Sequence, residues 1–215
     1  MRKTRYVVLL TVAAAFTAVA ADDTAERLGQ ATAVFNKLTG SGRGIQPERI
    51  ASADCIAVVP GFKKGAVVVG VGYGRGFISC RNGSNWSAPG AITLESGGVG
   101  VQLGGEKIDI VILSLDPDRR SKLLSDRFAI GSDASAAWGN GKTAHEDPNA
   151  KIIFYGQTKG AFAGFGLDGA TLKPDESSNK ALYGKTISNS EIIEGATTPA
   201  VAQTFVAKLA QPSSR

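Results

Sequence analysis

Residue types that commonly carry acid–base or nucleophilic chemistry are sparse in this chain. Its single histidine, His145, lies in a polar, turn-rich segment, and no GxSxG sequence is present that would form a nucleophile elbow. Aspartates such as Asp109, Asp116 and Asp133 show no spacing that singles out an acid–base pair. A metal site would need more ligands close to His145. We therefore expect a protein that is not an enzyme and that has no catalytic or metal-binding residues.

The segment Gly70-Val-Gly-Tyr-Gly-Arg-Gly76 has the glycine content of a nucleotide-binding loop but not its spacing. Every interval between its glycines is two residues, whereas the dinucleotide fingerprint is GxGxxG at the start of a helix. The sequence thus predicts no cofactor. In a strand, glycine at alternate positions leaves one face without side chains, so this strand can bend sharply or admit close neighbours.

The densest basic cluster of the sequence follows Phe62. Lys63 and Lys64 come directly after it, and Arg75 and Arg81 are nearby in sequence. Two lysines and an aromatic residue at a strand turn are suited to the phosphates of an anionic lipid surface, where each basic group contributes about 1 kcal/mol. The alternative is a pair of solvated turn lysines, which is the commoner outcome. We take these five residues as the candidate lipid-binding site.

Two cysteines, Cys55 and Cys80, lie at the start and the end of the glycine-rich stretch. We expect a disulfide between neighbouring strands, which would stabilise the fold by about 3 kcal/mol in the loop-closure model. The alternative is two buried thiols, since free cysteine often behaves as a small apolar residue. A zinc site is not expected, because neither a CxxC pair nor paired histidines accompany the cysteines.

Residues 1–20 have the features of a secretory signal peptide. Three basic residues precede an apolar run from Tyr6 to Val19, and Ala18-Val19-Ala20 provides a cleavage site of small residues. The run is shorter than the roughly 20 residues of a membrane-spanning helix, so an anchor is the less favoured alternative. No cysteine for lipid attachment stands at the cleavage point. We expect a periplasmic or secreted protein whose domain covers residues 22–211.

Cleavage would also change the charge balance of the chain. The full sequence has 24 basic and 19 acidic side chains, a net charge of +5. Removal of the three basic residues of the signal peptide leaves 21 against 19, or +2. A nucleic-acid partner is not expected, because such binding requires a basic stripe or patch. Any attraction to anionic partners must come from local clustering.

The order of elements predicts a single α+β domain in which a strongly curved, glycine-rich, mostly antiparallel and barrel-like sheet is flanked by N- and C-terminal helices. Strands are expected at Cys55–Val59, Ala66–Val71, Phe77–Cys80, Ile92–Leu94, Val99–Leu103, Ile108–Leu115, Ala134–Trp138, Ile152–Gln157 and Ala161–Leu167. Helices are expected at Asp22–Leu38, Pro47–Ala53, Asp116–Phe128 and Pro174–Tyr183, after the capping box Ser188-x-x-Glu191, and from Thr198 to Leu209.

The chain resembles the SYLF domain family, also called the Ysc84 or actin-regulator family. The resemblance covers nearly all of the chain after the signal peptide and is carried by motifs in the expected order. They are Pro47-x-x-Ile50-x-x-Ala53, Cys55-Ile-Ala-Val-Val-Pro60, Lys64-Gly65, Gly70-x-Gly72-x-Gly74-x-Gly76-Phe77, Arg81, Trp86-Ser87-x-Pro89, Gly97-Gly98-x-Gly100-x-Gln102-Leu103-Gly104-Gly105, Gly131-x-Asp133-Ala134-Ser135, Tyr155, Lys159-Gly160-Ala161-Phe162-Ala163-Gly164, Asn179, Tyr183-Gly184 and Ile192.

The resemblance implies a non-enzymatic module, because the family has no catalytic residues to transfer. Eukaryotic members resemble phosphoinositide-binding modules, some with actin-binding activity, and often carry SH3 domains. Actin is not an expected partner of an exported chain. We therefore expect a module of the cell envelope that binds anionic phospholipid surfaces. The alternative is a structural or protein-interaction component of the envelope, with an envelope protein as its partner.

Overall fold

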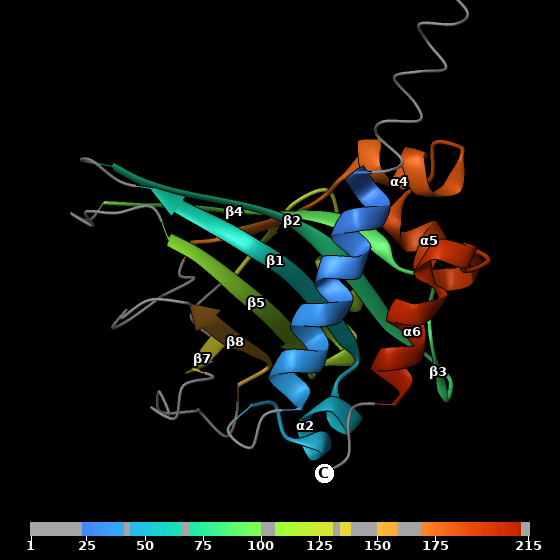
Figure 1. Cartoon of the computed structure of the whole chain (residues 1–215), viewed down its shortest axis with the longest axis horizontal. Coiled ribbons are helices and arrows are strands. Elements are labelled where there is room, and N and C mark those ends of the chain that lie inside the picture. The colour runs from blue at the N-terminus through green and yellow to red at the C-terminus, as the bar shows by residue number, and fades with distance from the viewer. Residues whose placement is uncertain are drawn as a thin grey trace, which may run out of the picture.

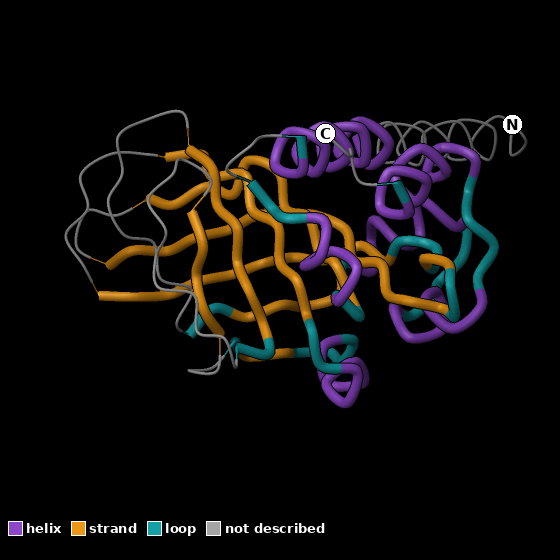
Figure 2. Tube along the Cα trace, turned by 90° about the horizontal axis from the view of Figure 1, so that it is seen from below, coloured by secondary structure: helices purple, strands orange, loops and turns teal. Residues whose placement is uncertain are grey.

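A strongly curved β-sheet forms the centre of the structure (Figures 1 and 2). The computed structural model describes residues 23–40, 44–65, 69–99, 106–130, 134–138, 150–158 and 169–211. Within these residues the sheet has nine strands in the order β6-β9-β4-β2-β1-β5-β8-β7, with β3 paired to β2. The strands are β1 (Cys55–Gly65), β2 (Val69–Asn82), β3 (Asn85–Trp86), β4 (Gly90–Val99), β5 (Glu106–Ser114), β6 (Phe128–Ala129), β7 (Ala134–Trp138), β8 (Ile152–Thr158) and β9 (Thr171–Pro174).

All strand pairs among the described residues are antiparallel except β7 with β8. A helix over residues 23–39 crosses the outer face of the sheet, and α4, α5 and α6 group beside it (Figure 1). The remaining helical elements are α2 (Pro47–Ser52), η1 (Pro117–Arg119), α3 (Arg120–Leu123), α4 (Glu176–Tyr183), α5 (Asn189–Gly195), η2 (Ala200–Ala202) and α6 (Gln203–Ala210). This arrangement confirms the predicted single-domain α+β fold with a curved sheet.

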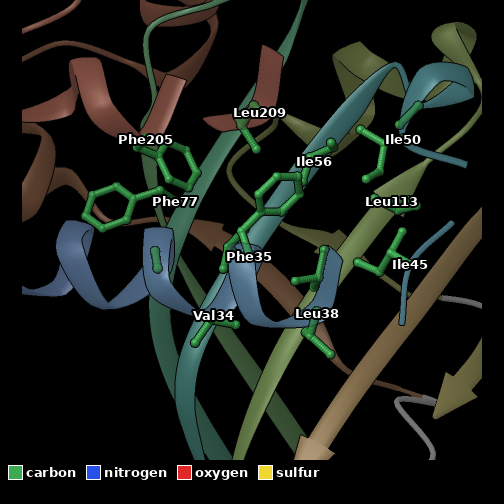
Figure 3. Close-up of a cluster of buried hydrophobic side chains, with 14 of the residues drawn as sticks. Val34, Phe35, Leu38, Ile45, Ile50, Ile56, Phe77, Leu113, Phe205 and Leu209 are labelled. Atoms are coloured by element: carbon green, nitrogen blue, oxygen red, sulfur yellow. The ribbon is translucent and has the colours of Figure 1, made fainter. Parts of the chain in front are cut away.

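Each face of the sheet buries its own hydrophobic core, because side chains alternate along a strand. On the outer face, Ile56 and Phe77 pack against Phe35 of the helix over 23–39 and against Phe205 and Leu209 of α6 (Figure 3). The inner core lies within the curve of the sheet and contains Cys55, Ala57, Val59, Phe62, Ile78, Ile110 and Leu172. The helix over 23–39 and α6 therefore cover the outer face, whereas the curved sheet encloses the inner core together with Leu123 of α3 and Ile193 of α5.

Strand β2 runs unbroken through the glycine repeat, so the described part of the strand predicted at Ala66–Val71 and the strand predicted at Phe77–Cys80 are one element. The missing side chains of Gly72 and Gly74 make room for the Phe62 ring, which lies 2.3 Å and 2.9 Å from the positions that Cβ atoms would occupy. At Gly76 the neighbour is the Val58 carbonyl oxygen, at 2.0 Å. The alternating glycines thus let β1 pack closely against β2, as their spacing predicts.

A β-bulge at Pro60 and Gly61 reverses the faces of β1. The register of β1 with both β2 and β5 shifts in this region. Gly61 has a φ of 57°, a left-handed conformation that glycine adopts readily, and its N–H donates to Asp109 Oδ1 at 3.0 Å. One extra residue in the strand moves the following side chains to opposite faces. Phe62 consequently points into the inner core, whereas Lys63 lies exposed on the outer face.

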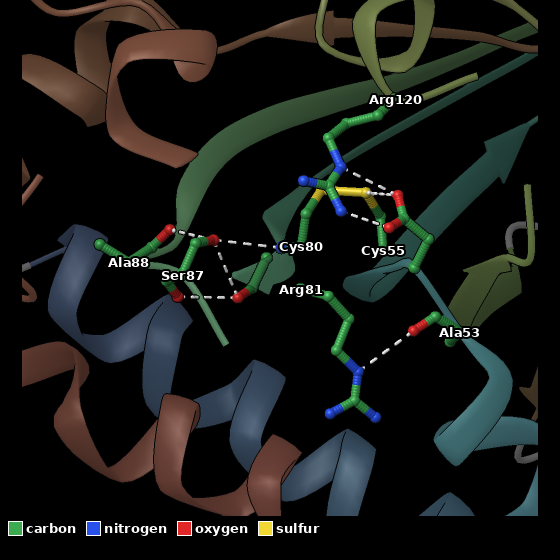
Figure 4. Close-up of a disulfide and its surroundings, with 9 residues drawn as sticks. Ala53, Cys55, Cys80, Arg81, Ser87, Ala88 and Arg120 are labelled. Carbon is green, nitrogen blue, oxygen red and sulfur yellow. Dashed lines mark hydrogen bonds and ion pairs between the residues drawn. A yellow bond between two sulfur atoms is a disulfide. The ribbon is translucent and has the colours of Figure 1, made fainter. Parts of the chain in front are cut away.

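Cys55 and Cys80 form a disulfide, which confirms the predicted bridge (Figure 4). They stand directly opposite each other in the β1–β2 register, with their Cα atoms 3.9 Å apart, and both are buried. Within the described residues no free cysteine remains. The bridge ties the two central strands together at the end of the sheet away from the bulge.

Several predicted boundaries were wrong or incomplete. The helix expected over Asp116–Phe128 ends at Leu123, and Phe128 instead forms β6, where it is buried opposite Leu172 of β9. The helix expected from Pro174 begins at Glu176, because Pro174 is the last residue of β9 and Asp175 is the N-cap. The capping box Ser188-x-x-Glu191 is confirmed. The predicted signal peptide and the strand predicted at Ala161–Leu167 lie outside the described residues.

Candidate functional site

A hollow of about 290 Å³ opens on the outer face of the sheet, next to the first turns of the helix over 23–39. We call it the basic hollow, because four of its lining residues are cationic and none is acidic. Its lining consists of Arg27, Gln30, Pro60, Gly61, Lys63, Tyr73, Gly74, Arg75 and Lys107. The sheet supplies most of these residues, and the helix supplies Arg27 and Gln30. Pro60, Gly61 and Gly74 leave its floor largely free of polar side chains.

One row of residues across three strands forms the lysine end of the hollow. Lys63 of β1 stands opposite Tyr73 of β2 and opposite Lys107 of β5. Like charges directly opposite each other in a sheet are destabilising. Among the described residues no carboxylate pairs with either lysine. Tyr73 is 50% exposed, an unusual exposure for a large hydrophobic residue of this protein. This end therefore places two cationic side chains beside an exposed aromatic ring, with no ion pair to a described carboxylate.

The arginine end of the hollow has a different electrostatic arrangement. Arg75 Nε donates to Asp175 Oδ2 at 2.6 Å, and its Nη2 donates to Ser178 Oγ at 2.8 Å. The hydrogen bond to Asp175 raises the pKa of Arg75. Arg27 forms an ion pair with Asp23 on its own helix, and Arg75 Nη1 lies 3.7 Å from the same carboxylate. The two arginines are thus held in place by acidic partners.

The position of α4 is fixed by buried amides, and this position sets the place of Asp175. Asn179 Oδ1 accepts from the Ala91 N–H at 2.7 Å, and its Nδ2 donates to Asn189 Oδ1 at 2.7 Å. Asn189 Nδ2 in turn donates to the Ala91 carbonyl at 3.1 Å. Gly90 leaves the space that Asn189 fills, since a Cβ there would lie 2.6 Å from Asn189 Oδ1. These satisfied buried groups rigidly join α4 and α5 to β4.

Asp175 carries the clearest acid-dependent contribution to stability near the hollow. Burial alone would raise the pKa of its carboxyl group. The hydrogen bonds from Arg75, Ser177 and the Ser178 N–H outweigh this effect and lower the pKa below its ordinary value of 3.8. A lowered folded-state pKa means that the unfolded chain binds the proton more readily. The stability is therefore present above about pH 4 and is lost as the pH falls through the folded-state pKa.

We expect Asp175→Asn to lower the urea midpoint of unfolding at about pH 7, because it removes the charge that pairs with Arg75. The difference between the variant and the wild type should shrink as the pH falls from about 4 through the folded-state pKa, because the wild-type carboxyl group then takes up its own proton. Glu176→Gln, at the exposed neighbouring residue, is the matched control. A difference that stays constant until the protein unfolds in acid would contradict this assignment.

The structure brings together only part of the cluster that the sequence predicted. Lys63 and Arg75 both line the basic hollow. Phe62 does not join them, because the bulge turns its ring into the inner core with no exposed surface. The prediction that Phe62 contacts lipid is therefore corrected: its side chain is part of the inner core. The side chain of Lys64 lies outside the described part of the structure.

Arg81 belongs to a different region of the molecule. It lies six residues beyond Arg75 in β2, a separation of about 20 Å along an extended strand. Its guanidinium lies 4.2 Å from the Trp86 ring centroid, and its Nε donates to the Ala53 carbonyl at 3.3 Å (Figure 4). It lines a second hollow with Arg120 of α3 and Glu194 of α5. Arg81 thus lies at the disulfide end of the sheet and is not part of the basic hollow.

Three residues of the basic hollow were missed by the sequence analysis: Arg27, Tyr73 and Lys107. Arg27 belongs to a predicted amphipathic helix, and its place follows only from how that helix crosses the sheet. Lys107 meets Lys63 through the β1–β5 pairing, which depends on the bulge. The available signal was Pro60-Gly61 in the middle of an apolar strand, a sequence typical of a bulge.

Comparison with known proteins identifies the family to which the chain belongs. A family model described as "Ysc84: Las17-binding protein actin regulator" matches residues 95–211, more than half of the chain. The chain belongs to the Ysc84 family. Of the cationic residues in the basic hollow, only Lys107 falls within the matched residues. No solved structure gave a significant match.

Relatives of the Ysc84 family extend the likeness over most of the chain. An SH3 domain-containing protein, PJ696.02, of Schizosaccharomyces pombe is 30% identical over 73% of this chain and 38% of its own length. The SH3 domain-containing YSC84-like protein 1 of Xenopus laevis is 32% identical over 68% of this chain and 45% of its own length. Protein YSC84 of Saccharomyces cerevisiae is 28% identical over 74% of this chain and 36% of its own length. The matched region thus spans less than half of each of these relatives.

Two other kinds of site are absent from the part of the chain that the structure describes. No helix there has both the length and the apolar character needed to cross a membrane. No group of three or more histidine, cysteine, aspartate or glutamate side chains is arranged to hold a metal ion among those residues.

Proposed function

We propose that this Ysc84-family domain is a non-enzymatic module that binds anionic phospholipid surfaces through the basic hollow. The observation that carries the proposal is the facing pair Lys63 and Lys107, which no described carboxylate neutralises. Two like charges placed side by side reduce stability, and an anionic ligand between them would convert this repulsion into attraction.

The dimensions of the hollow fit a lipid headgroup better than a whole lipid. Its volume of about 290 Å³ accommodates a phosphate group with part of its ester substituent, while acyl chains would remain outside. Tyr73 stands half exposed beside the lysines. Tyrosine is favoured at membrane interfaces, where its ring contacts apolar groups and its hydroxyl stays hydrated. The lysines and Tyr73 would therefore approach the bilayer together.

The expected localisation rests on the predicted signal peptide and not on the described structure. With the expected signal peptide, the domain would work in the periplasm or outside the cell, where the disulfide can form and persist. The rival function is binding of an envelope protein, and it is favoured by the family description, which names Las17 binding. A relative from Saccharomyces cerevisiae, matched in two strains, is likewise named LAS seventeen-binding protein 3. We do not propose actin as a partner of an exported chain.

Co-sedimentation with vesicles separates the two functions. We expect the purified protein to bind vesicles that contain phosphatidylglycerol and to leave pure phosphatidylcholine vesicles unbound. Binding should weaken as salt rises, since exposed charges are screened within about 10 Å at 0.1 M ionic strength. Failure to bind anionic vesicles even at low salt would reject lipid binding and favour the protein-interaction function.

A further inference from the structure

The bulge in β1 is closed by a side chain of the neighbouring strand β5. The β1–β5 register breaks after Val59 and resumes at Phe62. Pro60 and Gly61 therefore stand together opposite one residue of β5, Asp109. The extra residue of a bulge has no regular partner in the hydrogen-bond ladder. The Gly61 N–H instead donates to Asp109 Oδ1 at 3.0 Å.

Asp109 lies beside the basic hollow but is not one of its lining residues. It follows Lys107 by two positions in β5, so the two side chains share the outer face of the sheet. Among the described residues Asp109 forms no ion pair with Lys107 or Lys63. Its carboxylate is therefore engaged by the backbone of the bulge, and the two lysines keep their charge for a ligand.

The bulge holds both the floor of the hollow and one of its lysines. Pro60 and Gly61 line the hollow, and Lys63 is the next residue of β1 on the outer face. Phe62 is buried in the inner core, so it keeps the strand in register whether or not the bulge is closed. Glycine adopts several backbone conformations at little cost. The hydrogen bond to Asp109 thus selects the local conformation of Gly61, with its φ of 57°, and so sets the position of Lys63.

We propose, on the basis of the lipid-binding function above, that Asp109 is a positioning residue of the basic hollow. It fixes the bulge in the conformation that places Lys63 opposite Lys107. It therefore supports the binding of an anion although it is itself an anion, and the ligand does not have to touch it. Charge alone predicts the opposite, since a negative charge near an anionic surface opposes binding.

The test uses two neutral replacements of Asp109, so that the change in charge is the same in both. Asp109→Asn keeps an acceptor oxygen for the Gly61 N–H, whereas Asp109→Ala removes it. The apparent affinity falls in proportion to the fraction of molecules in the binding-competent conformation. We expect Asp109→Ala to bind phosphatidylglycerol vesicles about fivefold more weakly than Asp109→Asn at low salt, because one net hydrogen bond shifts an equilibrium by about this factor. Asp109→Asn should bind at least as tightly as the wild type.

Glu48→Gln and Glu48→Ala form the matched control pair, because Glu48 is exposed on α2 outside the hollow. These two variants should bind equally. Asp109 is only half-buried, so Asp109→Ala should fold, and binding is measured below its thermal unfolding transition. If folded Asp109→Ala binds as tightly as Asp109→Asn, Asp109 acts only on folding or through its charge, and the positioning proposal is wrong while lipid binding stands. If neither the wild type nor Asp109→Asn binds, lipid binding itself fails, and the positioning proposal fails with it.

Discussion

Replacement of Gly76 by valine should unfold the domain under conditions in which the wild-type protein is fully folded. A Cβ atom at this position would lie 2.0 Å from the Val58 carbonyl oxygen and 2.8 Å from the Val59 Cα. Both atoms belong to the backbone of β1, so no change of side-chain rotamer relieves the overlap. The two central strands would have to separate next to the bulge. We expect a loss of about 4 kcal/mol or more, at the high end for a single substitution.

A graded series of alanine variants tests this explanation by urea unfolding. Gly76→Ala should be strongly destabilising, whereas Gly72→Ala should cost less, because its nearest neighbours are the Phe62 ring and the Ser96 hydroxyl, which can shift. Gly97→Ala is the control, since no atom lies within 4 Å of the added methyl group. Equal midpoints for the three variants would show that glycine in this sheet is not required for close packing.

The sequence predicted those features that depend on local spacing. Alternating glycines from Gly70 to Gly76 predicted a strand with one bare face, and the bare face receives Phe62 and the β1 backbone. Ser188 and Glu191 predicted a helix start that the structure shows in full. The Cys55–Cys80 bridge was predicted in preference to two free thiols, and the structure confirms it.

The candidate site was only partly predictable, because it depends on one inserted residue. Strict alternation from Cys55 would place Lys63 in the inner core and Phe62 on the outer face. The bulge at Pro60 and Gly61 reverses both, so the lysine and not the phenylalanine reaches the hollow. A one-residue change of register moves every later side chain to the other face. The position of a β-bulge within a strand cannot be predicted from hydrophobic alternation alone.

Long-range pairing explains the remaining differences. Lys107 and Arg27 reach the hollow through the β1–β5 pairing and the crossing of the N-terminal helix, neither of which leaves a local pattern. Arg81 was grouped with Arg75 because they are close in sequence. An extended strand instead carries them to opposite ends of the sheet.

Reversal of both lysines should nearly abolish binding to anionic vesicles. Lys63→Glu/Lys107→Glu removes two attractive charges from the hollow and adds two repulsive ones. At about 1 kcal/mol for each unit of charge near the surface, the change amounts to about 4 kcal/mol, or roughly a thousandfold in partitioning. Folding should be preserved, because both side chains are exposed and no described carboxylate pairs with them.

The control must carry the same change in net charge at other places on the surface. Lys122→Glu/Lys208→Glu fulfils this requirement, since Lys122 lies exposed on α3 and Lys208 lies exposed on α6. Co-sedimentation of the wild type and the two double variants with phosphatidylglycerol vesicles at low salt then tests the basic hollow directly. If the basic hollow binds lipid, Lys63→Glu/Lys107→Glu should stay in the supernatant. Lys122→Glu/Lys208→Glu should sediment with the vesicles nearly as the wild type does. Equal binding by the two double variants would contradict a lipid-binding role for the hollow.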